Sequence, residues 1–249
     1  MGNIFGDKKV NLSVLENRDG TYFKIYGGKP YSGLAESYYE NGKIKIQINF
    51  YDGKPNGMFK EYYKNGQLNK EVRYIDGNPY GIFREFYSDG QLELEGNYII
   101  STHKHIDFLL LDGVNSWFCS KAESFLHGAY KEYYENGKPR KVCNYLLGKR
   151  HESYKRYFEN GQLQYEAHYK VGSLEGWQKK YFKNGQLQYE AHYRFGKKNG
   201  LYKSYYENGQ IKILIHYFEG ERCYEYKSYY ENGQIKSNLY YKNGEPEEF

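Results

Sequence analysis

Apolar and polar residues alternate with a period of two through much of the chain. The stretch from Leu92 to Glu95 shows this alternation in its plainest form. Successive side chains of a β-strand point to opposite faces of the sheet, so the pattern predicts strands with one face turned towards a core. The sequence therefore predicts an all-β chain.

Turn dipeptides divide this pattern at a fixed interval. Asn-Gly or Asp-Gly begins at residues 41, 65, 89, 136, 160, 184, 208 and 232. Neighbouring copies are 24 residues apart, except for a step of 47 that indicates an insertion of about 23 residues in the fourth repeat. Such dipeptides between strands are typical of hairpins, because a two-residue type I′ turn needs positive φ at both central positions. Each repeat is therefore expected to be one hairpin with a type I′ turn.

A second glycine follows each dipeptide by about 11 residues in most repeats and marks the turn into the next hairpin. Strand, turn, strand and turn then follow one another as an antiparallel β-meander. We expect an elongated array of tandem hairpin repeats over residues 33–249, with the insertion at about residues 100–127. Residues 1–32 are expected to form an N-terminal cap and a partial repeat.

Counting outward from the turns predicts which residues face each other across the hairpins. Tyr63 is expected opposite Leu68, and Tyr62 opposite Asn69. The same count places opposite charges together in the pairs Lys60 with Glu71, Arg84 with Glu95, Lys155 with Glu166, and Lys179 with Glu190. Pairs of this kind contribute about 0.2 to 1 kcal/mol each, so their recurrence supports the predicted register.

This register predicts a sheet with two different faces. One face is expected to carry an apolar ladder that holds the array together, formed by an aromatic column (Tyr39, Tyr63, Tyr87, Tyr134, Phe158, Phe182, Tyr206 and Tyr230) and an aliphatic column (Ile44, Leu68, Leu92, Leu163, Leu187, Ile211 and Ile235). The opposite face is expected to carry a second aromatic column (Tyr38, Tyr62, Phe86, Tyr133, Tyr157, Tyr181, Tyr205 and Tyr229) beside basic residues (Lys60, Arg84, Lys131, Lys155, Lys179, Lys203 and Lys227).

Aromatic rings beside cationic groups are typical of protein-binding surfaces. Because the apolar ladder already has a structural task, we expect the second face to bind a partner, and its tyrosines to have no such task. The alternative is that these tyrosines only stiffen an exposed sheet. The expected partner-binding residues are Tyr157, Tyr181, Tyr205, Lys155, Lys179 and Lys203, together with Trp117 and Phe118 of the insertion.

Composition changes this picture in one respect. Hydrophobic residues make up 39% of the chain, charged residues make up 27% and the mean hydropathy is −0.97, a balance that by itself favours disorder. However, 33 Tyr and 14 Phe supply large contact areas and a preference for strands, so an ordered sheet is expected. The net charge of +5 is spread along the chain without the concentrated basic stripe of nucleic-acid-binding proteins. The expected partner is a protein, with no specific nucleic acid.

Three features predict a cytoplasmic protein. Cys119, Cys143 and Cys223 show no C-x-x-C spacing, which indicates a reducing compartment. No apolar stretch approaches the roughly 18 residues of a membrane span, and the first 20 residues lack the apolar core of a secretory signal. Attachment to a membrane surface remains open as the less favoured alternative.

Candidate metal ligands occur at two places in the sequence. His168, His192 and His216 share one position of the repeat, but equivalent residues lie two strands apart, roughly 9 to 10 Å. Zinc-bound nitrogens lie only about 2 Å from the metal, so these side chains are not expected to share one ion. The run from His103 to Asp107 matches the start of the H-x-H-x-D-H motif of metallo-β-lactamase-like hydrolases, but Phe108 replaces its last histidine.

Sequence motifs of catalysis and nucleotide binding are otherwise lacking. No G-x-S-x-G elbow, Walker loop or dinucleotide fingerprint occurs, and the recurring glycines stand in turns between strands. We therefore expect no catalytic residue, no metal and no cofactor. The sequence predicts that the protein is not an enzyme.

One motif recurs in every repeat. Gly176 to Tyr193, with the sequence GWQKKYFKNGQLQYEAHY, shows the pattern aromatic-aromatic-x-Asn/Asp-Gly, which recurs in eight copies over about residues 33 to 244. These repeats resemble MORN repeats, in the bacterial variant found in the YwqK family of antitoxins. The resemblance implies tandem MORN-type hairpins and an antitoxin or immunity protein that neutralises a cognate bacterial toxin by direct binding. A MORN-repeat scaffold or membrane-peripheral module is the alternative. Glu152 and Tyr224 depart from the pattern, because other repeats have Gly there.

Overall fold

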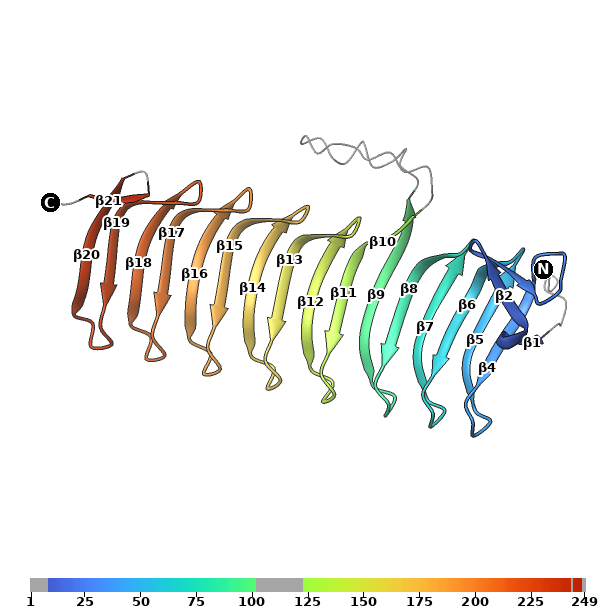
Figure 1. Ribbon diagram of the computed structural model, residues 1–249. Coiled ribbons are helices and arrows are strands. Elements are labelled where there is room, and N and C mark those ends of the chain that lie inside the picture. The colour runs from blue at the N-terminus through green and yellow to red at the C-terminus, as the bar shows by residue number, and fades with distance from the viewer. Residues whose placement is uncertain (1–8, 102–122, 243, 248–249) are drawn as a thin grey trace. The chain divides into compact units, whose positions relative to one another are not determined.

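The computed structural model describes residues 9–101, 123–242 and 244–247. Nearly all of these residues lie in strands, and the sequence-derived class, an all-β antiparallel meander of hairpin repeats, is confirmed (Figure 1). The chain divides into two compact units, Met1–Gly128 (unit 1) and Ala129–Phe249 (unit 2). The sequence-based division into a cap at residues 1–32 and an array at 33–249 stays a prediction.

Seven strands of unit 1 follow one another as an antiparallel meander. They are β4 (Gly33–Tyr38), β5 (Ile44–Tyr51), β6 (Lys54–Tyr62), β7 (Leu68–Ile75), β8 (Asn78–Phe86), β9 (Leu92–Ser101) and β10 (Glu123–Leu126). Glu123 of β10 lies opposite Ser101 of β9, so residues on both sides of the insertion continue the sheet. Trp117 and Phe118, two of the predicted partner-binding residues, lie outside the described residues.

The first residues of unit 1 pack beside β4. Strand β1 (Lys9–Asn11) pairs with β4 in parallel, and the 3-10 helix η1 (Leu12–Val14) leads into a hairpin of β2 (Leu15–Arg18) and β3 (Thr21–Lys24). Val10, Leu12, Leu15 and Tyr22 pack against buried Phe50 and its neighbours. At the turn after β5, Tyr22 N–H donates to Gly53 O at 2.7 Å. This segment therefore covers one edge of the meander in unit 1.

Unit 2 continues the same plan with consecutive antiparallel strands. They are β11 (Gly128–Tyr133), β12 (Pro139–Leu146), β13 (Lys149–Tyr157), β14 (Leu163–Lys170), β15 (Ser173–Tyr181), β16 (Leu187–Arg194), β17 (Lys197–Tyr205), β18 (Ile211–Phe218), β19 (Glu221–Tyr229), β20 (Ile235–Lys242) and β21 (Glu245–Glu247).

The Asn-Gly turns are not the type I′ turns that the sequence predicts. In the first of them Gly42 N–H donates to Tyr39 O at 2.9 Å, and Tyr39 N–H donates to Lys43 O at 2.8 Å. Gly42 has φ of +78°, whereas Asn41 is not among the residues with positive φ. This is a three-residue loop, a tight turn closed by a left-handed glycine. The prediction of a two-residue loop here is wrong.

Hydrogen bonding explains why asparagine stands in these turns. Asn41 Oδ1 accepts a hydrogen bond from Lys43 N–H at 3.1 Å and shapes its own loop. Asn41 Nδ2 donates to Lys64 O at 3.2 Å in the turn of the next hairpin. The same link to the next turn recurs at Asn65, Asn136, Asn184 and Asn208. The amide therefore ties neighbouring hairpins together along the row of turns.

Type I′ turns occur instead at the second glycine of the repeat. Asp52 and Gly53 join the paired residues Tyr51 and Lys54 with φ values of +46° and +74°. Five further turns have positive φ at the same two positions, and their first residues are Asp76, Leu147, Val171, Phe195 and Glu219. This turn type suits the right-handed twist of paired strands, which explains its place between hairpins.

The predicted charge pairs are confirmed, but the register changes next to the Asn-Gly turns. Lys60 lies opposite Glu71, and the other three predicted pairs are also formed. Tyr62, however, lies opposite Leu68 and not Asn69, because a bulge adds one residue to β7. The same shift occurs in seven hairpins. Because one residue reverses the side to which a strand's side chains point, the aliphatic column lies on the face of Tyr62. The prediction that the aliphatic column belongs to the apolar ladder is therefore wrong.

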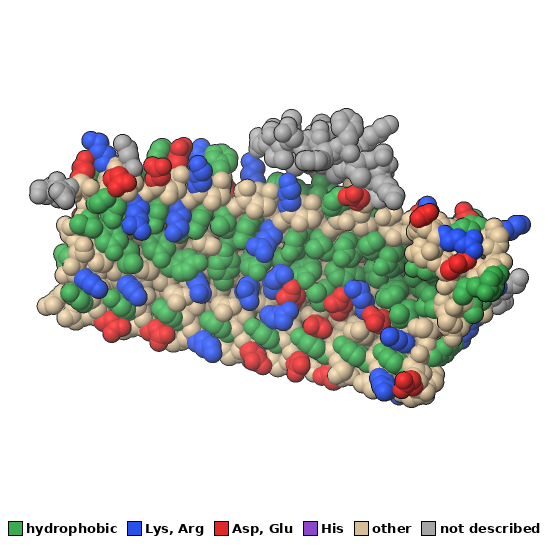
Figure 2. All heavy atoms as spheres, in the orientation of Figure 1, with side chains coloured by type: hydrophobic (Ala, Val, Ile, Leu, Met, Phe, Trp, Pro, Cys, Tyr) green, Lys and Arg blue, Asp and Glu red, His purple; other side chains and the backbone are tan. Residues whose placement is uncertain are grey.

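The buried side chains come from the middle of the strands. In unit 1 they include Phe50, Val72 and Phe83, and in unit 2 Cys143, Tyr154, Ala167, Tyr169, Ala191, Ile215 and Tyr241. We call the face of unit 2 that carries this second group the tyrosine face. The opposite face carries Lys155, Glu166, Lys179, Glu190 and Lys203. We call it the ladder face, after this ladder of alternating charges; it is not the face of the predicted apolar ladder. Over β13 to β19, Figure 2 shows a band of hydrophobic side chains with Lys and Arg side chains along it.

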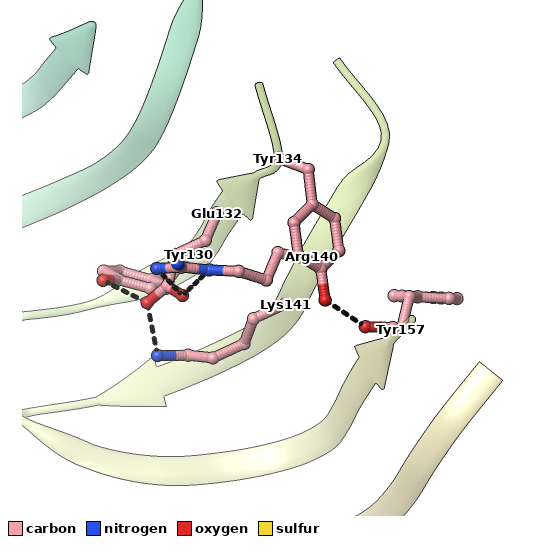
Figure 3. A network of polar contacts seen from close by, with 6 residues as sticks. All are labelled: Tyr130, Glu132, Tyr134, Arg140, Lys141 and Tyr157. Atoms are coloured by element: carbon pink, nitrogen blue, oxygen red, sulfur yellow. Dashed lines mark hydrogen bonds and ion pairs between the residues drawn. The ribbon is translucent and has the colours of Figure 1, made fainter. Parts of the chain in front are cut away.

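The first aromatic column joins neighbouring hairpins through its hydroxyls. Tyr39 OH donates to Tyr62 O at 2.7 Å, and Tyr134 OH donates to Tyr157 O at 2.8 Å (Figure 3). Tyr63 and Tyr206 make the same bond to the following repeat. These bonds satisfy carbonyls beside the bulges, where the regular ladder of the sheet is interrupted. The predicted structural role of this column thus operates through hydrogen bonds as well as through packing.

Candidate binding face

The ladder face carries a row of alternating charges. Lys155, Glu166, Lys179, Glu190 and Lys203 lie opposite one another in turn on five consecutive strands, β13 to β17. Lys203 Nζ lies 3.9 Å from Glu190 Oε1. Half-exposed pairs of this kind contribute about 0 to 1 kcal/mol each. The three predicted lysines are therefore brought together, but with carboxylates between them, and the row is close to electrically balanced.

The predicted tyrosines lie on this face and are not free of structural tasks. Tyr181 OH donates to Glu166 Oε1 at 2.8 Å, and Tyr205 OH donates to Glu190 Oε1 at 3.0 Å. Burial and the hydrogen bond to Glu190 raise the pKa of Tyr205 to about 12, and burial and Glu166 raise the pKa of Tyr181 further. Both hydroxyls therefore remain protonated donors, and the expectation that these rings have no structural task is wrong. Tyr157 lies opposite Leu163 on the same face.

An open hollow of about 540 Å³ lies in the ladder face of unit 2. Its lining includes Lys155, Glu166, His168, Trp177, Lys179 and His192. Trp177 is 48% exposed, and its ring meets the His192 ring edge-on with centroids 5.3 Å apart. The hollow therefore combines a large exposed aromatic side chain with both signs of charge.

Trp177 is the residue that the sequence reasoning missed. A signal for it exists, because the same position holds Met58, Ile82 and Leu201 in three other repeats, whereas it holds Ser153 and Glu225 in two more. Met58 and Ile82 are 38% and 55% exposed, so in these repeats the position points apolar side chains into water. Large aromatic residues are costly to expose and are common as anchors of protein interfaces. The repeat position thus marks Trp177 as the strongest candidate for contact with a partner.

Two of the histidines that share one position of the repeat lie on the ladder face. His168 and His192 both line the hollow. The part of the chain that the structure describes contains no group of three His, Cys, Asp or Glu residues arranged to hold a metal ion. His103, His105 and Asp107 lie outside that part. That the protein uses no metal, cofactor or catalytic residue stays a prediction.

A largely buried carboxylate, Glu132, lies on the tyrosine face. Glu132 accepts hydrogen bonds from Lys141 Nζ at 2.7 Å, Tyr130 OH at 2.9 Å and Arg140 Nε at 3.1 Å (Figure 3). Burial by itself would raise the pKa of Glu132, but the hydrogen bonds from Lys141, Tyr130 and Arg140 hold it below its ordinary value. The network is saturated, which indicates a structural role.

The described residues contain no helix that is long and apolar enough to cross a membrane. The fold defines a tandem hairpin repeat module whose sheet has two open faces. The chain belongs to the MORN repeat variant family, which matches more than half of it, at residues 31–51, 55–76, 79–99, 126–146, 153–170, 174–194, 198–219 and 225–243. The predicted MORN-type repeats are thereby confirmed, and the family match does not single out antitoxins among them.

No curated protein matches the chain. Among solved structures, a chain of the complex described as "Crystal Structure of TcdB2-TccC3-Cdc42" is similar at 11% identity with a TM-score of 0.16. The similarity covers 93% of this chain, which spans 15% of that one.

Proposed function

We propose that this protein is a non-enzymatic binding protein that holds a partner protein against its ladder face, with Trp177 as the central anchor. The observation that carries the proposal is the half-exposed Trp177 ring in an open hollow of about 540 Å³. Protein interfaces concentrate their binding energy in a few aromatic residues surrounded by polar groups. Lys155, Glu166 and Lys179 supply such a polar rim.

We also propose that the partner is a cognate bacterial toxin, so that the protein acts as a cytoplasmic antitoxin or immunity protein. The resemblance of Gly176 to Tyr193 to repeats of YwqK-type antitoxins supports this partner. The alternating charges of the ladder face also favour a folded protein as partner, since a polyanion or an anionic membrane would meet Glu166 and Glu190 as well as the lysines.

A binding measurement tests both proposals. The full chain is titrated with the purified product of each neighbouring gene, and we expect a one-to-one complex with one of them. Trp177→Ala should weaken that complex at least about 30-fold, which corresponds to the roughly 2 kcal/mol of an interface hot spot. Ile82→Ala is the matched control, because Ile82 occupies the same repeat position in unit 1 and is 55% exposed.

Two results would overturn the proposals separately. An unchanged affinity of Trp177→Ala would exclude the hollow as the binding site. The absence of a complex with any neighbouring gene product, combined with salt-sensitive sedimentation with anionic vesicles, would replace the antitoxin by a membrane-peripheral module.

A further inference from the structure

The tyrosine face of unit 2 carries cations without matching carboxylates. They are Arg150, Arg156, Lys180, Lys198 and Arg222. Among the described strand residues, one carboxylate points to this face, that of Glu132. It already forms ion pairs with Arg140 and Lys141. Glu152 turns away through its φ of +58°, and its Oε2 lies 3.4 Å from Asn144 Nδ2. The two faces of unit 2 therefore differ sharply in charge balance.

Three of these cations are held by tyrosine rings. A ring attracts a cation through its π electrons and leaves the positive charge uncancelled, so the charge stays available to a ligand. The distances from cation to ring centroid are 4.8 and 5.4 Å for Arg150 over Tyr154 and Tyr169, 4.7 and 4.8 Å for Lys198 over Tyr202 and Tyr217, and 5.6 Å for Arg222 over Tyr241.

The other two cations flank one tyrosine. Arg156 and Lys180 both lie directly opposite Tyr165, on the strands to either side of it. With Arg150, they line a hollow of about 370 Å³. The same repeat position holds Ser37, Glu61, Glu85, Glu132, Ser204 and Ser228 in the other repeats. The change to a cation is thus confined to two consecutive repeats.

We propose that the tyrosine face of unit 2 binds an extended, acidic polypeptide segment of a partner protein. The cations extend from β13 to β19, six strand spacings or about 29 Å at about 4.8 Å each. An extended chain of about nine residues covers this length at about 3.3 Å per residue, whereas a small anion reaches one end only. Carboxylates of the segment pair with the cations and also accept hydrogen bonds from tyrosine hydroxyls.

Ring geometry favours a polypeptide over a single-stranded nucleic acid. Bases bind single-strand-binding proteins by stacking on open aromatic faces. Here the faces of Tyr154 and Tyr169 are covered by Arg150, and the two rings also meet edge-on, with centroids 5.9 Å apart at 66°. A carboxylate needs only the cationic groups at the rim, and Arg150 and Arg156 are exposed.

The test uses the full chain and three fluorescent probes: a peptide of ten glutamates, a peptide of ten lysines and a ten-residue thymidine oligonucleotide. We expect the glutamate peptide alone to bind, with an affinity that falls as salt is added. Arg156→Gln combined with Lys180→Gln should weaken it at least tenfold. Lys155→Gln combined with Lys179→Gln, the matched pair on the ladder face, should leave it unchanged.

The outcome is independent of the proposed function, because Trp177→Ala should not alter binding of the glutamate peptide. A single Lys180→Glu variant checks the site without removing two side chains, and should weaken binding more than Lys180→Gln. Thermal melting establishes that each variant is folded. Three results would overturn the proposal. They are tighter binding of the oligonucleotide than of the glutamate peptide, no binding of the glutamate peptide, or folded Arg156 and Lys180 variants that bind the glutamate peptide as tightly as the unmodified chain does.

Discussion

The hydroxyl of Tyr181 donates a hydrogen bond to Glu166 at 2.8 Å, which joins strand β15 to strand β14. One side chain of the ladder face thus stabilises the sheet and also borders the surface proposed to bind a partner. A variant that removes the whole ring therefore confounds stability with binding. A variant that removes only the hydroxyl separates the two effects.

Tyr181→Phe should lower the free energy of unfolding by about 1 kcal/mol, because Glu166 loses a half-buried donor while the ring stays. Urea unfolding followed by circular dichroism measures this change. Tyr157→Phe is the control at the same repeat position, and we expect the smaller loss there. An unchanged unfolding midpoint for Tyr181→Phe would show that this hydrogen bond contributes nothing.

Gly53→Ala should be more destabilising than Gly77→Ala by at least about 1 kcal/mol. Both glycines have positive φ, +74° and +85°, so both variants share the backbone cost. A Cβ at Gly53 would meet Thr21 and lie 2.9 Å from Tyr22 O, whereas a Cβ at Gly77 meets nothing within 4 Å. Thermal melting of the two variants isolates the contact between this turn and β3. Equal melting temperatures would show that β3 moves aside without cost.

Val171→Asn should stabilise the protein by about 1 kcal/mol, because Val171 has φ of +47° and a β-branched residue is strained there. Asparagine tolerates this conformation. Asp76→Asn, at the same position of another turn, is the control and should change little, since Asp also tolerates positive φ. The free energy of unfolding in urea measures both. A destabilised Val171→Asn variant would show that packing of the valine outweighs its backbone strain.

Glu132 should make the stability of the protein fall on acidification. Its pKa is lowered in the folded protein, so its contribution is fully present above the ordinary carboxyl pKa of about 4.3 and is lost as pH falls through the lower folded value. Melting temperatures between about pH 2.5 and 7 should show this decline. Glu132→Gln should melt lower near neutral pH, and the gap to the wild type should narrow in acid. A constant gap across this pH range would contradict the assignment, and Glu207→Gln in an exposed turn serves as the control.

The hairpin repeat, its interval and the charge pairs could be predicted from the sequence because they depend on short-range features. The distance between two turn glycines fixes the length of a hairpin. The pairing of Lys155 with Glu166 follows from counting away from one turn. Neither depends on how distant segments pack.

The side to which residues point next to the turns was decided only by the tertiary structure. In the turn that contains Asn184, its side chain accepts a hydrogen bond from Gln186 N–H and donates one to Glu207 O of the next hairpin. These two bonds stabilise a three-residue loop. The bulge that accompanies this loop places Leu187 opposite Tyr181. A one-residue change reverses the face of a side chain, and no pattern within a single repeat reports it.

The candidate binding surfaces divide in the same way. The sequence by itself determined that Lys155 and Lys179 share a face, since both lie one step from a charged partner at a fixed place in the repeat. Only the tertiary structure decided that Trp177 stands half exposed in a hollow between them and that Arg156 and Lys180 lie without carboxylates on the other face. The physical reason is that a hollow and a charge imbalance are properties of side chains from several strands taken together, whereas the repeat pattern describes each strand separately.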